Sequence, residues 1–145
     1  MTELWLKTVS SPKDLEHAFM VRREVFMLEQ KISEEEELDE FDQTAIHLLA
    51  FKDDVPIGTC RMRWINSSII KAERVAVRKE FRQTGAGRKL MLHLEKVAQQ
   101  QGAQAIMLNA QVQVVPFYQK LGYQPTGAPF YEAGIEHVPM TKVLN

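Results

Sequence analysis

Three consecutive strand patterns joined by short turns constrain the fold of this chain more than any other feature. They cover residues 45–52, 57–65 and 69–78. Strands joined by such short connections run antiparallel to one another. A helical pattern at about 85–101 and an apolar strand at 104–110 follow, and a strand–helix–strand unit normally places its two strands parallel. The sequence therefore predicts a mixed, mostly antiparallel sheet with helices packed against it.

The flanking segments enlarge this sheet. Ser11-Pro12 followed by Asp14 is typical of a helix start, and apolar residues continue an amphipathic pattern to about residue 29. Further elements are predicted as a strand at 2–9, an exposed acidic loop or short helix at 33–43, a short helix at 113–121, and strands around 122–131 and 135–144. We expect an α/β (α+β) protein, one domain over residues 1–145, with a twisted sheet of about seven strands flanked by helices.

Composition narrows the classes of partner. Lys and Arg number 18 and Asp and Glu number 19, which gives a net charge of -1 and no support for nucleic acid as a partner. The apolar stretches fall short of the roughly 20 residues that a membrane helix needs, and the N-terminus does not resemble a signal peptide. The single cysteine, Cys60, excludes an internal disulfide. Together these features predict a cytoplasmic protein without membrane partners.

One glycine-rich turn indicates a ligand. Arg82-Gln83-Thr84-Gly85-Ala86-Gly87 lies between a predicted strand and a predicted helix. Glycines allow the backbone to approach a ligand closely, and a helix N-terminus presents unpaired N–H groups with a partial positive charge, which suits a pyrophosphate. The spacing fits neither a Walker A loop nor a dinucleotide fold. A tight turn without a ligand is the alternative for this motif taken alone.

A second motif turns this signal into a family resemblance. Leu108-Asn109-Ala110-Gln111 is followed by Phe117-Tyr118-Gln119-Lys120-Leu121-Gly122-Tyr123, a strand and helix ending in F-Y-x-K-x-G-[FY]. Together with R-x-x-G-x-G, and with the order of elements along nearly the whole chain, this resembles the GNAT superfamily of N-acetyltransferases. The resemblance implies a GNAT fold, acetyl-CoA as co-substrate, direct transfer of the acetyl group to an amine, and a monomer or homodimer.

The resemblance also implies residue roles. Backbone N–H groups of Gln83, Thr84, Gly85, Ala86, Gly87 and Arg88 would bind the phosphates, with help from the Arg82 side chain. Val75 and Val77 would pair with the pantetheine arm, and the Val75 N–H would face the thioester oxygen. Asn109 would contact the arm where two strands splay apart. Tyr118 would lie at the sulfur as the general acid; a tyrosine merely packed on the sheet is the alternative.

Two residues compete for the role of general base. Glu73 matches a strand glutamate that serves as base in many family members, and apolar neighbours could raise its pKa. Its alternative role is a structural carboxylate paired with Arg61 or Arg63 across the turn. His137 resembles a histidine near the substrate in some branches, and histidine exchanges protons near neutral pH. An ordinary histidine at a strand end is its alternative.

The acceptor is open at this level. The acidic run 34–42 could attract a cationic amine or could simply be solvated, whereas Arg61 and Arg63 could hold an anionic acceptor. Cys60 alternates with Met62 and Trp64, which favours a core position over a nucleophile. The four histidines lack metal-ligand spacing, so no metal is expected.

The first helix carries one more pattern. Arg22-Arg23-Glu24-Val25-Phe26, then Glu29-Gln30, resembles the R-x-x-V-F-x-x-E-Q pattern of a small bacterial GNAT branch. Acyl-homoserine lactone synthases share the fold and a similar R-x-x-V-F pattern, but they are generally longer and lack this pyrophosphate turn. They remain a distant alternative. The other alternative, from a different functional class, is a coenzyme A-binding sensor without turnover.

Overall fold

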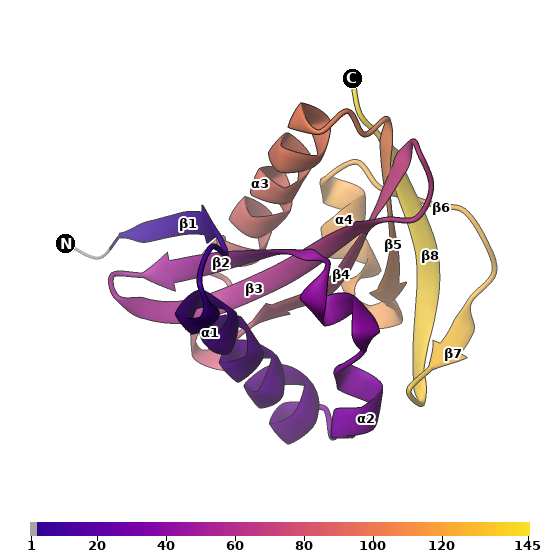
Figure 1. Cartoon of the computed structure of the whole chain (residues 1–145). Helices are drawn as coiled ribbons and strands as arrows, with labels where there is room; N and C mark the ends of the chain where they lie inside the picture. Colours follow the sequence, from indigo (N-terminus) through magenta and orange to yellow (C-terminus); the bar gives the residue numbers. More distant parts are fainter. Residues whose placement is uncertain (1–2) are drawn as a thin grey trace.

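The computed structural model describes residues 3–145 and places eight strands in one mixed sheet (Figure 1). Four strands form an antiparallel succession: β1 (Leu4–Thr8), β2 (Ile46–Lys52), β3 (Val55–Trp64) and β4 (Ile69–Val77). The strand predicted at 2–9 corresponds to β1, and residue 2 lies outside the described residues. The predicted antiparallel arrangement is confirmed, because β2 pairs antiparallel with β3 and β3 pairs antiparallel with β4.

The second part of the sheet contains its one parallel pair in the described chain. β5 (Ala105–Gln111) runs parallel to β4, as the strand–helix–strand pattern predicts, and β8 (Ile135–Val143) pairs antiparallel with β5. The strand predicted around 122–131 is instead two short pieces, β6 (Gln124–Pro125) and β7 (Phe130–Glu132), both paired with β8. Pro125, Gly127 and Pro129 interrupt this stretch, because proline cannot donate to a strand ladder.

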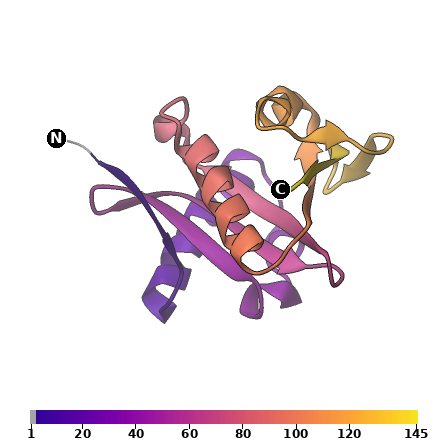
Figure 2. The same cartoon turned by 90° about the horizontal axis from the view of Figure 1, so that it is seen from above.

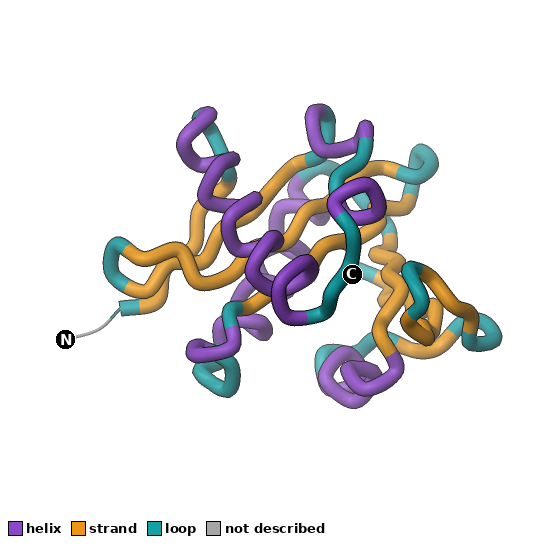
Figure 3. The backbone as a smooth tube through the Cα atoms, turned by 90° about the horizontal axis from the view of Figure 1, so that it is seen from below, coloured by secondary structure: helices purple, strands orange, loops and turns teal. Residues whose placement is uncertain are grey.

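Helices cover both faces of the sheet (Figure 3). α1 (Pro12–Arg22) packs on one face, where the Ser11 hydroxyl caps it by accepting from the Asp14 N–H at 3.1 Å. α3 (Ala86–Gln100) packs on the other face with a fully buried stripe: Leu90, Met91, Leu94 and Ala98. Most of the core lies between α3 and the sheet, and it includes Cys60 as expected. Figure 2 shows the C-terminal elements gathered at one side, apart from β1.

The first helix differs from the predicted single α-helix. After Arg22 the chain continues as a π-helix, η1 (Arg23–Glu29), and the Gln30 N–H donates to the Val25 carbonyl at 3.1 Å, five residues back. π-Helical turns widen a helix and occur often at functional sites. Phe26 and Glu29, on this wider segment, both border the large cavity described below.

The acidic segment 33–43 is only partly what its composition predicts. It forms two short helices, α2 (Glu34–Glu37) and the 3-10 helix η2 (Glu40–Gln43). The expectation that it is too acidic to enter the interior is wrong for Glu37 and Asp42, which are 2% and 7% exposed. Both carboxylates are buried against arginines from distant parts of the chain, and buried charges persist where they are paired.

Candidate active site

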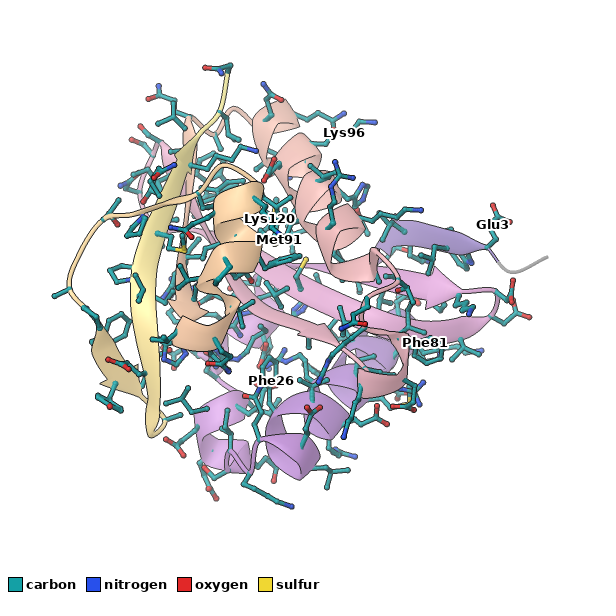
Figure 4. The ribbon with its side chains drawn as sticks, turned by 180° about the vertical axis from the view of Figure 1, so that it is seen from behind. Glu3, Phe26, Phe81, Met91, Lys96 and Lys120 are labelled. Atoms are coloured by element: carbon teal, nitrogen blue, oxygen red, sulfur yellow. The ribbon has the colours of Figure 1, made fainter. Side chains whose placement is uncertain are left out.

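A cavity of about 1040 Å³ opens between the two parts of the sheet. Its lining brings together most of the residues predicted from the sequence: Glu73, Val75, Val77, Arg82, Gln83, Gly85, Gly87, Arg88, Asn109, Tyr118 and His137. Thr84 and Ala86 belong to the same turn, but they do not border the cavity. Figure 4 labels Phe26, on η1, and Met91, on α3.

The cavity forms where β4 and β5 diverge. Their parallel pairing runs from Ile69↔Ala105 to Ala72↔Leu108 and ends there. Beyond that point β5 pairs only with β8, as far as Gln111↔His137. Asn109 is the first residue past the last β4–β5 pair, so it lies at the point of divergence as predicted. A slot with backbone on both walls is suited to an extended, narrow ligand.

A bulge in β4 lies on the wall of this slot. Thr59 pairs with Ala76 and Arg61 with Glu73, so Arg74 and Val75 together lie opposite Cys60. Arg74 has a φ of 55°, a left-handed conformation that is unusual for a residue inside a strand. Two residues opposing one disrupt the ladder locally. The bulge therefore places Val75 in an irregular stretch of backbone beside the cavity.

The turn before α3 has the form that anion binding requires. Gln83 and Gly85 have φ values of 66° and 88°, which fold the chain sharply into the helix. The Lys89 N–H is the first to find a helical acceptor, the Gly85 carbonyl at 3.0 Å. Within residues 3–145, the N–H groups from Gln83 to Arg88 have no protein acceptor. Unpaired N–H groups at a helix N-terminus, together with the helix dipole, are chemically suited to bind phosphate oxygens.

The absence of a side chain at Gly87 leaves this helix end accessible to a ligand. A Cβ added at Gly87 would lie 3.3 Å from the Phe117 ring and 3.8 Å from Val77. A side chain at Gly87 would therefore crowd the passage between the turn and α4 (Val115–Lys120). Close approach of the backbone to a ligand at these glycines stays a prediction, and the limited space around Gly87 is consistent with it.

The Arg82 side chain forms hydrogen bonds with other protein groups. Its Nη1 and Nη2 each lie 2.6 Å from a carboxylate oxygen of Glu29, and its Nε donates to the Val77 carbonyl at 2.9 Å. Hydrogen bonds from Arg82 lower the pKa of Glu29. Arg82 is thus fixed against β4, whereas Arg88 is exposed, borders the cavity and forms no ion pair in the described chain. Arg88 is the more available cation for a phosphate.

The side-chain oxygen of Asn109 is an acceptor that a ligand could use. This oxygen is buried and has no hydrogen-bond partner among residues 3–145. Buried polar atoms nearly always find a partner, so an unpaired one bordering a cavity indicates that a ligand group or a water molecule completes it. An amide N–H of a pantetheine arm would satisfy an acceptor of this kind. The residues present therefore fit coenzyme A at both its phosphate and its pantetheine ends.

Tyr118 lies in the interior with access to the cavity. It is 7% exposed and packs edge-on against Phe117 and Tyr123, with ring centroids 5.0 and 5.8 Å away. Burial raises the pKa of its hydroxyl, and nearby Cys60 adds to the effect. A hydroxyl that stays protonated at neutral pH can donate. Burial likewise raises the pKa of the Cys60 thiol, so Cys60 is a core side chain.

Glu73 does not have the environment expected of it. Arg61 and Arg63 both donate to its Oε1, at 3.2 and 2.8 Å from their Nε atoms, and Lys71 lies 3.3 Å from Oε2. Burial raises its pKa, but these cations outweigh burial and the pKa falls below its ordinary value. The predicted rise in its pKa is therefore wrong, and the alternative, a carboxylate paired across β3 and β4, is what the structure shows.

His137 borders the cavity from β8. It is 8% exposed and stacks on Phe130 at 5.8 Å between ring centroids. Its Nδ1 lies 2.7 Å from the Ile135 carbonyl oxygen. Because a carbonyl only accepts, Nδ1 must carry the proton in this bond, and the neutral ring keeps its lone pair on Nε2. His137 therefore has a nitrogen able to take up a proton.

A buried charge network, which the sequence patterns do not predict, lies next to these residues. Its inner part joins Arg22 and Arg61, 1% and 0% exposed, to Glu37 and Asp42. Arg22 lies 2.5 Å from Glu37 and 2.6 Å from Asp42, and Arg61 lies 2.6 Å from Asp42. Arg61 cannot hold an acceptor anion, because protein carboxylates already take up its donors.

The outer part of the network reaches the cavity. Arg74 lies 2.6 Å from Glu37, and Asp39 lies 2.7 Å from Arg61 and 3.3 Å from Arg74. Glu73, with Arg63 and Lys71, completes this group, which we call the charge network: Arg22, Glu37, Asp39, Asp42, Arg61, Arg63, Lys71, Glu73 and Arg74. One sequence feature pointed toward this network: the first-helix pattern, whose first residue is Arg22.

The rest of that pattern also faces the site. Val25 and Phe26 border the cavity, Glu29 holds Arg82, and the Gln30 side-chain oxygen accepts from Gln111 at 2.9 Å. The Gln30–Gln111 bond connects the helix to the end of β5. Every named position of R-x-x-V-F-x-x-E-Q thus contacts either the cavity or the network that borders it.

Comparisons with known proteins agree with this geometry. A family model described as an acetyltransferase (GNAT) domain matches residues 9–144. The Bacillus subtilis protein named uncharacterized N-acetyltransferase YjcF is 41% identical over 131 residues, covering 90% of this chain and 93% of that protein. A crystal structure from Lactobacillus plantarum, of a protein provisionally named an N-acetyltransferase, superposes with a TM-score of 0.90 at 30% identity and covers 98% of this chain and 99% of that one.

The chain therefore belongs to the GNAT acetyltransferase family. The fold is also shared by PaiA N-acetyltransferase from Thermoplasma acidophilum, solved in complex with coenzyme A, with a TM-score of 0.75 at 20% identity over 98% of this chain and 99% of that one. No helix within residues 3–145 is long and apolar enough to cross a membrane. The same residues contain no group of three or more His, Cys, Asp or Glu side chains placed to hold a metal ion.

Proposed function

We propose that this protein is an acetyl-CoA-dependent N-acetyltransferase that transfers the acetyl group directly to an amine. The observation that carries the proposal is the divergence of β4 and β5 at Ala72 and Leu108. The divergence opens one cavity that is bordered by the helix N-terminus at Gln83–Arg88, whose N–H groups are unpaired, and by Asn109, Tyr118 and His137. Membership of the GNAT acetyltransferase family supports the same activity.

Binding follows from the slot. The N–H groups from Gln83 to Arg88 bind the pyrophosphate, with the exposed Arg88 adding charge. Val75 and Val77 present backbone to the pantetheine arm from β4, and Asn109 accepts from an arm amide. The Arg82 guanidinium is hydrogen-bonded to Glu29 and Val77. Its main role is therefore to hold the turn in place, not to bind phosphate.

The chemistry then needs a base, an acid and an oxyanion donor. The thioester supplies an activated acetyl carbon. As the amine nitrogen bonds to this carbon and the carbon–sulfur bond breaks, His137 Nε2 takes the amine proton and the Tyr118 hydroxyl gives a proton to the leaving sulfur. The Val75 N–H stabilises the thioester oxygen while it carries negative charge. Solvent then takes the extra proton from His137 and returns a proton to the Tyr118 oxygen.

The activity is tested by following free thiol release from acetyl-CoA with a panel of amines. Amine-dependent thiol release, with the acetylated amine found by mass spectrometry, supports the proposal. Tight binding of acetyl-CoA without thiol release for any amine contradicts it and favours a coenzyme A-binding sensor. Tyr118→Phe tests the acid: turnover should fall about 100-fold with unchanged coenzyme affinity, whereas Tyr131→Phe, at a position 73% exposed, should change neither.

The choice of base is tested by pH–rate profiles. A base that must be deprotonated produces an acidic limb in kcat/KM, and its removal erases that limb. We expect His137→Ala to lose the limb and Glu73→Gln to keep it, because the carboxylate of Glu73 is committed to Arg61, Arg63 and Lys71. The reverse result would assign the proton transfer to Glu73.

A further inference from the structure

The charge network is not electrically balanced. Its direct ion pairs link five cations to four carboxylates, an excess of one positive charge. Within residues 3–145, none of the nine side chains makes an ion pair with a group outside the network. A surplus charge on a partly desolvated wall is costly unless solvent or a ligand compensates it. The position of the surplus therefore indicates where a ligand of opposite charge would bind.

The excess positive charge lies at one end of the charge network. Arg22, Arg61 and Arg74 are matched in number by Glu37, Asp39 and Asp42, and each of these arginines reaches two carboxylates of that set. What remains is Glu73 with Arg63 and Lys71. Both cations have Glu73 as their one ion-pair partner in the described chain, and Arg61 also draws on it.

Strand geometry directs this end to the cavity. Arg63 lies directly opposite Lys71 in the β3–β4 ladder, as Arg61 lies opposite Glu73, so all four side chains share one face of the sheet. The Arg63 guanidinium lies 3.9 Å from the centre of the Phe41 ring. Arg63 and Lys71 are 22% and 19% exposed and both border the large cavity.

Both cations have donors to spare. Arg63 uses Nε and Nη2 on Glu73, and Nη1 has no acceptor within residues 3–145. Lys71 Nζ is 3.3 Å from Glu73 Oε2 and makes no hydrogen bond in the described chain. An ammonium has three donors and a guanidinium five, so a second oxyanion can be accommodated here without displacing Glu73.

The acidic run does not offer a competing site of equal strength. Glu37, Asp39 and Asp42 are neutralised within the network. Glu36 and Glu132 border the cavity too, but both are exposed, so water screens their charge more effectively. The sequence alone allowed two kinds of acceptor, a cation held by the acidic segment or an anion held by Arg61 and Arg63. The structure favours the anion, and the two side chains available to hold it are Arg63 and Lys71.

We propose that the acceptor is a small amine that also carries a carboxylate, and that Arg63 and Lys71 bind this carboxylate. The proposal rests on the proposed N-acetyltransferase function. It also has a chemical consequence for the reacting group, because nearby positive charge disfavours an ammonium ion and favours the neutral amine that can attack the thioester.

Pairs of amines that differ only by the carboxylate test the proposal. Suitable pairs are phenylalanine with phenethylamine, tyrosine with tyramine, and lysine with cadaverine. In at least one pair, the acid should have a kcat/KM at least 10-fold higher. Lys71→Met should reduce this preference to near parity without changing acetyl-CoA affinity. Lys96→Met, at an exposed position on α3 labelled in Figure 4, is the matched control and should preserve it. Preference for the decarboxylated amine, or a preference unaffected by Lys71→Met, overturns the proposal.

A binding measurement separates this inference from the proposed function. Titration calorimetry with coenzyme A present compares N-acetylphenylalanine with N-acetylphenethylamine, and repeats the comparison for tyrosine and lysine products. Stronger binding of a carboxylated product that depends on Lys71, without turnover of any amine, would refute the acetyltransferase function and support the anion site. Turnover without carboxylate preference would refute the anion site alone. Neither turnover nor Lys71-dependent binding would refute both.

Discussion

The two ends of the cavity are built by different means. At the proposed cofactor end, the available groups are main-chain N–H groups from one contiguous stretch, Gln83–Arg88. At the proposed acceptor end, the groups are side chains, and the charge network joins residues as far apart in the sequence as Arg22 and Arg74. The first end depends on backbone conformation and the second on the matching of buried charges.

This difference teaches how each end responds to substitution. Backbone donors persist when most side chains change, so the cofactor end should tolerate replacement except where a glycine is needed. Buried ions depend on one another, because removing one partner leaves the other charged and desolvated. The acceptor end should therefore fail as a unit. Four predictions test this contrast, in order of decreasing effect.

The largest effect is expected at Arg22. Arg22→Met leaves Glu37 and Asp42 without their main buried partner, and breaking a buried pair in this way costs about 3–5 kcal/mol of unfolding free energy. Arg23→Met is the control, since the adjacent Arg23 is exposed and forms no ion pair in the described chain, and it should change stability by less than about 0.5 kcal/mol. Urea denaturation measures both. Equal losses would show that the network is not a cooperative unit.

A smaller effect should appear on acidification. Burial raises the pKa of Asp42, but Arg22, the Asp39 N–H and Arg61 outweigh it and lower the pKa from 3.8 to about 2. Asp42 then contributes about 2 kcal/mol above pH 4, which is lost as the pH falls from about 4 to about 2. Unfolding free energies measured across this range should fall accordingly, and the Arg22→Met variant should show a shallower fall. An equally steep fall in that variant would contradict the assignment.

Gly85 tests where the cofactor end is sensitive. Gly85→Ala and Gly102→Ala each place a Cβ in open space at a positive φ, 88° and 91°, and each should cost about 1 kcal/mol of stability. Gly102 ends α3 far along the helix from the turn, so only Gly85→Ala should also weaken coenzyme A binding. Calorimetric titration distinguishes the two. Equal affinity in both variants would place the phosphates elsewhere.

The smallest effect is expected for Thr84→Ala. The exposed Thr84 hydroxyl donates to the Phe81 carbonyl at 2.5 Å, but Thr84 does not border the cavity. If main-chain N–H groups bind the phosphates, removing this hydroxyl should change stability and coenzyme affinity by less than about 0.5 kcal/mol each. A tenfold loss of affinity would mean that side chains contribute at this end too.

The same contrast explains what could be predicted from the sequence. The turn at 82–87 and the Tyr118 segment are each contiguous in sequence, so their resemblance to GNAT motifs could be recognised, and that resemblance implied the fold and the residues around the cavity. The acidic segment was judged too charged to be buried, because its partners, Arg22 and Arg61, are brought to it only by folding. The pKa of Glu73 was misjudged for a related reason: its apolar neighbours along the strand matter less than the cations across it.

The bulge at Arg74 links the proposed oxyanion donor to the proposed acceptor site. Arg74 holds a left-handed backbone conformation inside β4 while its guanidinium is fixed to Glu37 at 2.6 Å, and the next residue, Val75, carries the proposed oxyanion donor. Mutations that retune the network for a new acceptor would therefore also shift that donor. A change in the proposed acceptor preference of this protein would therefore also require an adjustment of β4 around Val75.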